Sequence, residues 1–134
     1  MPKIEAGMES MLDTFIFETT GLLDNLDDIL IRTEISDMSP DDIAEIFRTM
    51  HTIKGSAAMM GPQNMAKLAH SVEDLFYIIR EDENVSYDKK ALYGLLFESS
   101  DCLKNEVEDI SDEDIPLSDF SDLMSRIHDF TDLM

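Results

Sequence analysis

The sequence contains one cysteine, Cys102, among 134 residues. A lone cysteine cannot form an internal disulfide, and ten methionines without a cysteine framework suit a reducing compartment. We therefore expect a cytoplasmic protein in which Cys102 is a small apolar residue of the core.

Basic residues are scarce as well. The 10 lysines and arginines face 30 acidic residues, which gives a formal net charge of −20. A surface this negative repels phosphate backbones and anionic lipid headgroups, so nucleic acid and membrane are excluded as expected partners. The same charge favours a monomer for the isolated domain and partners that are basic in patches.

Long hydrophobic runs are missing too. No stretch approaches the roughly 20 apolar residues that span a bilayer, and the opening MPKIEAGMES does not resemble a signal peptide. The hydrophobic fraction of 43% is nevertheless enough to build one continuous core. We therefore expect a single domain over residues 1–134.

No segment shows the alternating pattern of a strand. Apolar residues instead recur every three and four positions, the period of an amphipathic helix. Ser39-Pro40 is a typical helix start, and Gly61-Pro62 is a typical helix end. The sequence thus predicts an all-α fold, an antiparallel four-helix bundle with a fifth C-terminal helix packed alongside. The five predicted helices cover about residues 8–32, 40–60, 64–80, 88–110 and 118–133.

Motifs for common cofactors are also missing. No glycine-rich phosphate loop is present, so the sequence offers no recognisable way to bind ATP. The three histidines lie on different predicted helices without a cysteine partner, which does not fit zinc spacing. The patterns of a di-iron bundle and of a calcium loop are incomplete. We expect neither a cofactor nor a metal.

The run HTIKGSAAMMG in the second predicted helix carries the first candidate site. His51 follows the core position Met50, so it should lie on the shoulder of the buried face, held yet reachable. Lys54 can place its ammonium near a phosphate on His51. Gly55 costs helix stability, and with Ala58 it would leave clearance for a partner protein to approach the imidazole.

The run LAHSVED in the third predicted helix offers a second pair. If the two helices are antiparallel neighbours, Glu73 can accept the N–H of one ring nitrogen of His51 and leave the other as a nucleophile. We expect His70 to join this hydrogen-bond network. Alternatively, His70 and Glu73 form a solvated surface pair and His51 is a packing residue. His128 is interpreted as a surface residue without a role.

These two runs resemble the histidine phosphotransfer (HPt) family. His51, Lys54, Gly55 and Gly61 match its phosphorylation signature, and the spacing from His51 to His70 and Glu73 is similar to that of the N-terminal domain of CheA-type chemotaxis histidine kinases. The resemblance covers nearly the whole chain. Two departures, Ser56 and Met59-Met60, affect packing more than chemistry.

The resemblance implies a two-step phosphorelay. A separate ATP-binding kinase domain, in the same protein or a dimer mate, would phosphorylate His51, and an aspartate of a response-regulator receiver domain would take the phosphoryl group. The chain would then be a carrier without enzymatic activity of its own, in the N-terminal part of a longer kinase. Two alternatives are a free-standing phosphorelay carrier and a non-catalytic acidic helical docking module.

Overall fold

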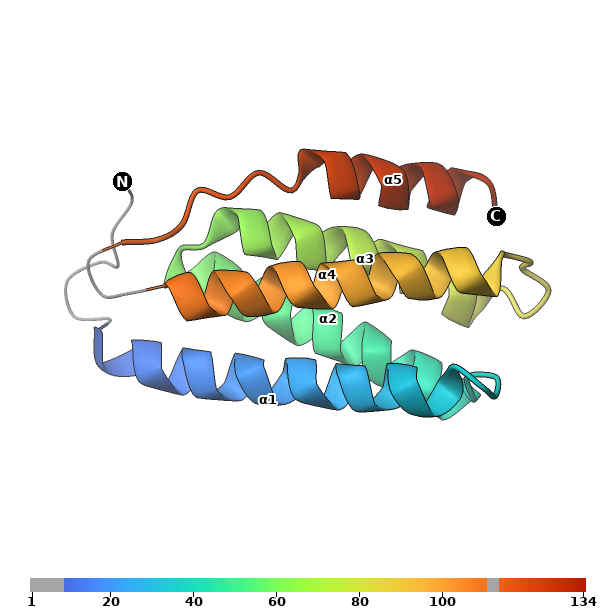
Figure 1. The fold of residues 1–134 in the computed structure, drawn as a ribbon, viewed down its shortest axis with the longest axis horizontal. Coiled ribbons are helices and arrows are strands. Elements are labelled where there is room, and N and C mark those ends of the chain that lie inside the picture. Colours follow the sequence, from blue (N-terminus) through green and yellow to red (C-terminus); the bar gives the residue numbers. More distant parts are fainter. Residues whose placement is uncertain (1–8, 111–113) are drawn as a thin grey trace.

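A computed structural model describes residues 9–110 and 114–134, and these residues form five helices and no strand (Figure 1). The predicted all-α class is therefore confirmed. The helices are α1 (Glu9–Thr33), α2 (Pro40–Met60), α3 (Gln63–Glu81), α4 (Lys89–Asp109) and α5 (Ser121–Asp132).

The first four helices form the predicted antiparallel bundle. Short connections join α1 to α2, α2 to α3 and α3 to α4, so consecutive helices run in opposite directions (Figure 1). The helix α5 packs against α3 and α4, on the side of the bundle away from α1 (Figure 1). The contact between α2 and α3, the two helices with the candidate residues, is the most extensive in the fold.

The ends of α2 follow from local chemistry, as the sequence predicted. The Ser39 hydroxyl accepts a hydrogen bond from the Asp42 amide, and the Asp42 carboxylate accepts one from the Ser39 amide, which completes a capping box. At the other end, Gly61 has a φ of 119°, in the left-handed region that favours glycine. A Cβ on Gly61 would also lie 2.7 Å from the Ile115 side chain.

The fifth helix begins later than predicted, at Ser121 instead of about residue 118. The delay has a physical reason, because side chains of the bundle hold Ser118 in the non-helical connection before α5. The Asn64 amide donates to the Ser118 carbonyl, and the Ser118 hydroxyl donates to Glu106. The other described helix ends lie within about one residue of the predicted ones, and the predicted start at residue 8 lies outside the described residues.

The core consists of apolar side chains from all five helices. The position of Cys102 differs from the prediction, because its side chain is only half-buried at the edge of this core. Leu96 and Leu103 occupy the buried face of α4, whereas residue 102 lies at the edge of that face, where the charges of Glu98 and Arg126 influence it. Partial burial raises the pKa of the Cys102 thiol.

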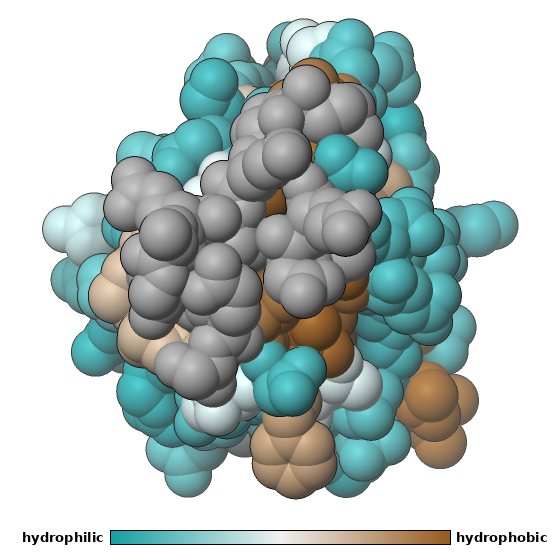
Figure 2. All heavy atoms as spheres, turned by 90° about the vertical axis from the view of Figure 1, so that its left-hand side faces the viewer, coloured by the Kyte–Doolittle hydropathy of each residue, from teal (hydrophilic) through white to brown (hydrophobic). Residues whose placement is uncertain are grey.

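One end of the bundle has a mainly hydrophilic surface in its described part (Figure 2). At the end of the bundle drawn in Figure 2, hydrophilic residues cover most of the described part, and hydrophobic residues show mainly near its middle. None of the helices in the described ranges is long and apolar enough to span a bilayer.

Candidate functional site

The packing of α2 against α3 brings His51 and Glu73 together across the helix interface. His51 lies on the outer flank of α2 with 65% of its side chain exposed, whereas only 8% of the Glu73 side chain is exposed. Glu73 therefore contributes a carboxylate from within the bundle to an imidazole that solvent can reach. This is the arrangement that the spacing of the two runs predicted.

The Glu73 carboxylate has a hydrogen-bond partner at each oxygen. Its Oε2 lies 2.5 Å from Nδ1 of His51, and its Oε1 lies 2.6 Å from Nζ of Lys54. Burial is the largest single influence on Glu73 and acts to raise its pKa. The hydrogen bonds and charges of Lys54 and His51 together outweigh that influence, so the pKa of Glu73 lies below its ordinary value. Glu73 is therefore a buried carboxylate that stays ionised.

The charge of Glu73 determines the tautomer of His51. An ionised carboxylate can only accept hydrogen bonds, so Nδ1 of His51 must carry the proton in their contact. In the neutral imidazole the lone pair then lies on Nε2, the ring nitrogen that Glu73 does not engage, in a side chain that is 65% exposed. The arrangement therefore presents a nucleophilic nitrogen to solvent and needs no further base to prepare it.

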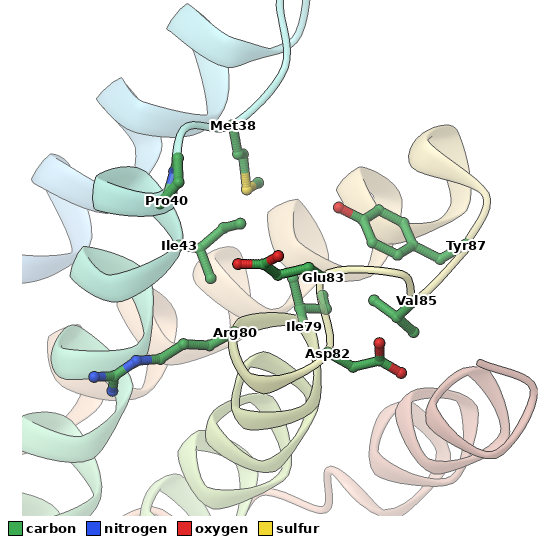
Figure 3. A pocket seen from close by; sticks show the side chains of 9 residues that line it. All are labelled: Met38, Pro40, Ile43, Ile79, Arg80, Asp82, Glu83, Val85 and Tyr87. Atoms are coloured by element: carbon green, nitrogen blue, oxygen red, sulfur yellow. The ribbon is translucent and has the colours of Figure 1, made fainter.

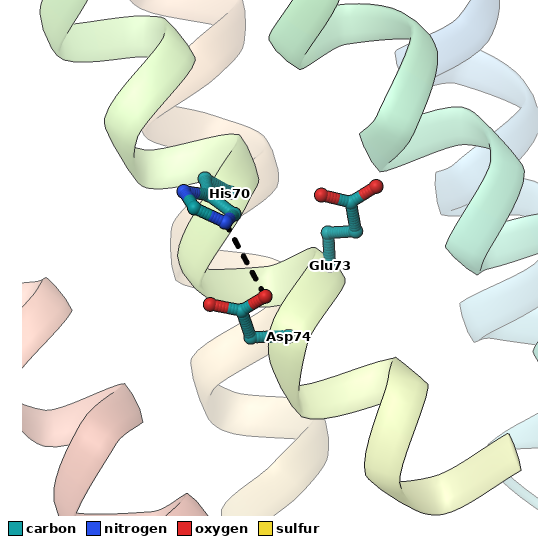
Figure 4. Close-up of side chains that lie close together, drawn as sticks. All are labelled: His70, Glu73 and Asp74. Atoms are coloured by element: carbon teal, nitrogen blue, oxygen red, sulfur yellow. Dashed lines mark ion pairs between the residues drawn. The ribbon is translucent and has the colours of Figure 1, made fainter. Parts of the chain in front are cut away.

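The prediction that His70 joins the hydrogen-bond network of His51 and Glu73 is wrong. Nε2 of His70 lies 3.4 Å from Asp74, and no hydrogen bond in the described part of the chain joins His70 to His51 or Glu73. The reason is the direction of the side chains on α3 (Figure 4). The Glu73 carboxylate points toward α2, whereas His70 and Asp74 lie together on another flank of the helix.

In the described part of the chain, His70, Glu73 and Asp74 form one group of side chains close enough together to be considered as metal ligands. One ligand atom from each of His70, Glu73 and Asp74 lies within 4.8 Å of the other two. Both oxygens of Glu73 are already engaged by Lys54 and His51, however. A metal bound through Glu73 would have to displace one of these partners, so the group does not fit a resident metal site.

An aromatic side chain lies beside His51, and two residues of α3 contact that side chain in turn. The Phe47 ring lies one turn before His51 on α2, with centroids 6.4 Å apart and planes within 13°. Tyr77 and Arg80 of α3 contact the same phenyl ring. Phe47 and His51 are four residues apart, which is one helical turn, but no signal in the sequence connected Phe47 to two residues of another helix.

The surface beside His51 is open. Phe47, Arg48, Thr52 and Glu73 line a depression around the imidazole. Gly55 is exposed, and a Cβ built on it would meet nothing within 4 Å. Ala58 is exposed as well. This geometry leaves room beside His51, and the role of Gly55 and Ala58 in partner approach stays a prediction.

A separate pocket of about 310 Å³ lies at the end of the bundle where the α1–α2 and α3–α4 connections meet (Figure 3). Its lining includes Met38, Ile43, Val85 and Tyr87, with no histidine. Arg80 borders the pocket but extends away from it across α2. The pocket therefore does not form part of the histidine site.

Comparisons with known proteins show the family of the chain. The family model described as "Hpt domain" matches residues 10–113, which include both helices of the site. The chain belongs to the Hpt domain family. The predicted resemblance is thereby confirmed.

Two relatives of this Hpt domain carry the name chemotaxis protein CheA. It is 35% identical over 123 residues to chemotaxis protein CheA of Borreliella burgdorferi, a match that covers 91% of this chain and 14% of the relative. Its identity to chemotaxis protein CheA of Treponema pallidum is 32% over 127 residues, which covers 95% of the chain and 15% of the relative. The Hpt domain thus spans about one seventh of these two relatives.

The fold of the Hpt domain has a close match among solved structures. The phosphorylated P1 domain of CheA3, solved in complex with CheY6 from R. sphaeroides, superposes with a TM-score of 0.82 at 23% sequence identity. The match covers 94% of this chain and 98% of that one. The five-helix arrangement is therefore shared along essentially the full length of both chains.

Proposed function

We propose that this Hpt domain is the phosphoryl carrier of a CheA-like chemotaxis kinase. In this proposal Nε2 of His51 accepts the γ-phosphoryl group of ATP from a separate kinase domain and passes it to an aspartate of a response regulator. The observation that carries the proposal is the contact between Nδ1 of His51 and the buried carboxylate of Glu73. That contact leaves the other ring nitrogen free to attack phosphorus.

The chemistry of the first step balances with the residues present. The Nε2 lone pair forms a bond to the γ-phosphorus as the bond between that phosphorus and the bridging oxygen of ATP breaks, and ADP leaves with its electron pair. No proton has to leave Nε2, because the proton of the neutral imidazole is on Nδ1. The imidazole becomes positively charged, and the Glu73 carboxylate 2.5 Å from Nδ1 stabilises that charge.

Lys54 has two tasks in the proposal. In the unphosphorylated domain its ammonium neutralises the buried Glu73 carboxylate at 2.6 Å. The same contact holds the ammonium beside His51, from where its flexible stem can reach a phosphoryl group on Nε2. Lys54 would therefore stabilise the phosphorylated state without a rigid bidentate contact that would trap it.

In the second step the phosphoryl group leaves His51 for an aspartate of a receiver domain. A receiver aspartate attacks phosphorus, the N–P bond breaks, and the electron pair returns to Nε2 as the neutral imidazole is restored. The proposal therefore needs two macromolecular partners, an ATP-binding kinase domain and a receiver domain. The relatives named CheA are several times longer than this chain, which supports a place within a longer kinase, with the chain acting as a carrier and not as an enzyme alone. The proposed compartment is the cytoplasm.

The proposal is tested by phosphorylation with a CheA-type kinase core and radiolabelled ATP. Label is expected on the wild-type domain, stable in alkali and lost in acid, and absent from His51→Gln. His128→Gln is the matched control, because His128 is an exposed histidine on α5, away from the site. If several kinase cores leave the wild type unlabelled, the domain is better interpreted as an acidic docking module.

A further inference from the structure

The single hydrogen bond of His51 leaves its ring incompletely restrained. Glu73 fixes the position of Nδ1, but 65% of the side chain is exposed and no second hydrogen bond to the imidazole is present among the described residues. A ring held at one atom can still tilt and move Nε2 sideways. Efficient attack on phosphorus requires Nε2 to stay aligned with the incoming group, because misplacement by about 1 Å can cost a rate factor of around 10².

The Phe47 ring supplies a second restraint. Its plane lies within 13° of the imidazole plane, and the 6.4 Å between the ring centroids is within the usual range for interacting aromatic pairs. Phe47 precedes His51 by four residues, so both side chains project from the same face of α2. The phenyl ring can therefore limit tilting of the imidazole toward the start of the helix.

Phe47 is in turn held from α3. The guanidinium carbon of Arg80 lies 5.3 Å from the centroid of the Phe47 ring, at cation–π distance. The Tyr77 ring contacts Phe47 with centroids 6.4 Å apart. Within the described ranges Arg80 forms no ion pair, although the chain carries 30 acidic residues. Its guanidinium instead lies over the phenyl ring beside the histidine.

We propose that Phe47, held by Tyr77 and Arg80, is a positioning residue that keeps the His51 imidazole aligned for phosphoryl transfer. The inference rests on the proposed function and deepens it. Glu73 sets the tautomer and Phe47 sets the orientation of the ring. The role of Arg80 is indirect, through the phenyl ring, and none of the three residues contacts a reacting atom.

The test separates ring orientation from partner docking by using phosphoramidate, a small phosphoryl donor with no protein surface. Phe47→Leu keeps the apolar bulk and removes the ring, whereas Phe47→Tyr keeps the ring. Phe47→Leu is expected to slow labelling of His51 by about three- to tenfold, a modest part of the loss that misplacement can cause. Phe47→Tyr should restore the wild-type rate, and Arg80→Gln should slow labelling by a smaller factor.

Nuclear magnetic resonance of the same unphosphorylated variants measures the orientation of the His51 ring directly. This orientation would not change if Phe47 and Arg80 contributed only to the stability of the fold. Wild type should show magnetisation transfer between the ring protons of His51 and Phe47 and one ordered imidazole orientation. Arg80→Gln should reduce the magnetisation transfer and make the orientation of the imidazole less ordered. Its circular dichroism spectrum and melting temperature should stay near those of wild type. Phe17→Leu, at an exposed phenylalanine on α1, is the matched control and should leave His51 unchanged.

The outcomes are distinguishable. Equal labelling rates and equal His51 spectra for wild type, Phe47→Leu and Arg80→Gln would overturn the positioning role while the carrier function stands. A Phe47→Tyr variant as slow as Phe47→Leu would overturn it as well. If wild type itself is never labelled at His51 by phosphoramidate or by a kinase core, the proposed function fails, and the spectra still decide whether Phe47 orders the ring.

Discussion

At the scale of single residues, Glu73 connects the packing of the bundle with the chemistry of its surface. A carboxylate with 8% of its side chain exposed would ordinarily be driven toward its neutral form. Lys54 and His51 reverse that tendency, so the pKa of Glu73 lies below its ordinary value. The interior of the protein therefore holds a charge that dictates where the proton of an exposed imidazole resides.

Glu73→Gln tests this tautomer control. The amide keeps the size of the side chain, but it loses the charge and can turn its NH₂ group toward His51, which would favour the wrong tautomer. We expect phosphorylation by a kinase core to slow by about 10- to 100-fold, the range seen when carboxylates that orient metal-binding histidines are removed. Asp74→Asn, the adjacent exposed acid, is the control and should label like wild type. Equal rates for Glu73→Gln and wild type would remove Glu73 from the mechanism.

Glu106 is a second buried acid, and its pKa is shifted in the opposite direction to that of Glu73. Its Oε1 accepts from Ser118, but its Oε2 has no partner in the described part of the chain. Burial raises the pKa of Glu106, with a smaller contribution from Asp109 in the same direction. Since the folded-state pKa is raised, the penalty for ionising Glu106 is absent below its unfolded-state pKa and grows as the pH rises above it.

Glu106→Gln should therefore stabilise the domain in a pH-dependent way. At pH 7 the neutral amide avoids the buried charge, and the free energy of unfolding should increase by about 1 kcal/mol relative to wild type. Near pH 3.5 both side chains are neutral and the difference should vanish. Denaturant unfolding at the two pH values measures this gap, and a gap that is independent of pH would show that ionisation of Glu106 is not its cause.

At the scale of helices, the start of α2 shows how few residues define an element. Asp42 accepts hydrogen bonds from the Ser39 amide and from the guanidinium of Arg32 on α1. The Arg32 hydrogen bond, followed by that of Ser39, lowers the pKa of Asp42 to about 2. One side chain therefore caps α2 and connects it to α1, which fixes where the helix of His51 begins.

Asp42→Asn should weaken this start. We expect the free energy of unfolding to fall by about 1 kcal/mol at pH 7, since the Arg32 partner is largely exposed and its ion pair is screened. The depressed pKa means that the contribution of Asp42 is present above the unfolded-state value near 4 and is lost as the pH falls toward 2. Asp41→Asn, one residue earlier, is the control in urea titrations. A deficit in Asp42→Asn that persists at pH 2 would contradict the assignment.

Helices and caps were predictable from the sequence because their causes are local. The period of apolar residues, Ser39-Pro40 and Gly61-Pro62 act within one or two turns, and the structure follows them. The late start of α5 was missed because its cause is tertiary: Ser118 accepts a hydrogen bond from α3 and donates one to α4, and both hold it outside the helix. The directions of the side chains around α3 could likewise not be predicted from the sequence. His70 was therefore assigned to the hydrogen-bond network of His51, whereas it pairs with Asp74 in the structure.

At the scale of the whole molecule, the bundle acts as a rigid support that presents one histidine from a strongly acidic body. The pairing of Glu73 with His51 was predictable because sequence spacing and antiparallel neighbours suffice to bring two helix faces together. The contacts of Lys54 with Glu73 and of Arg80 with Phe47 were not, because they depend on how long side chains cross the interface between α2 and α3. Together these contacts leave Nε2 of His51 as the ring nitrogen that Glu73 does not engage.

The most direct measurement is to locate the phosphoryl group on the ring. The domain, labelled with ¹⁵N at histidine and phosphorylated by a CheA-type kinase core, would be analysed by ¹H–¹⁵N and ³¹P nuclear magnetic resonance. The account predicts a single N–P bond at Nε2 of His51 with the proton retained on Nδ1 beside Glu73. A phosphoryl group on Nδ1, or on a residue other than His51, would contradict it.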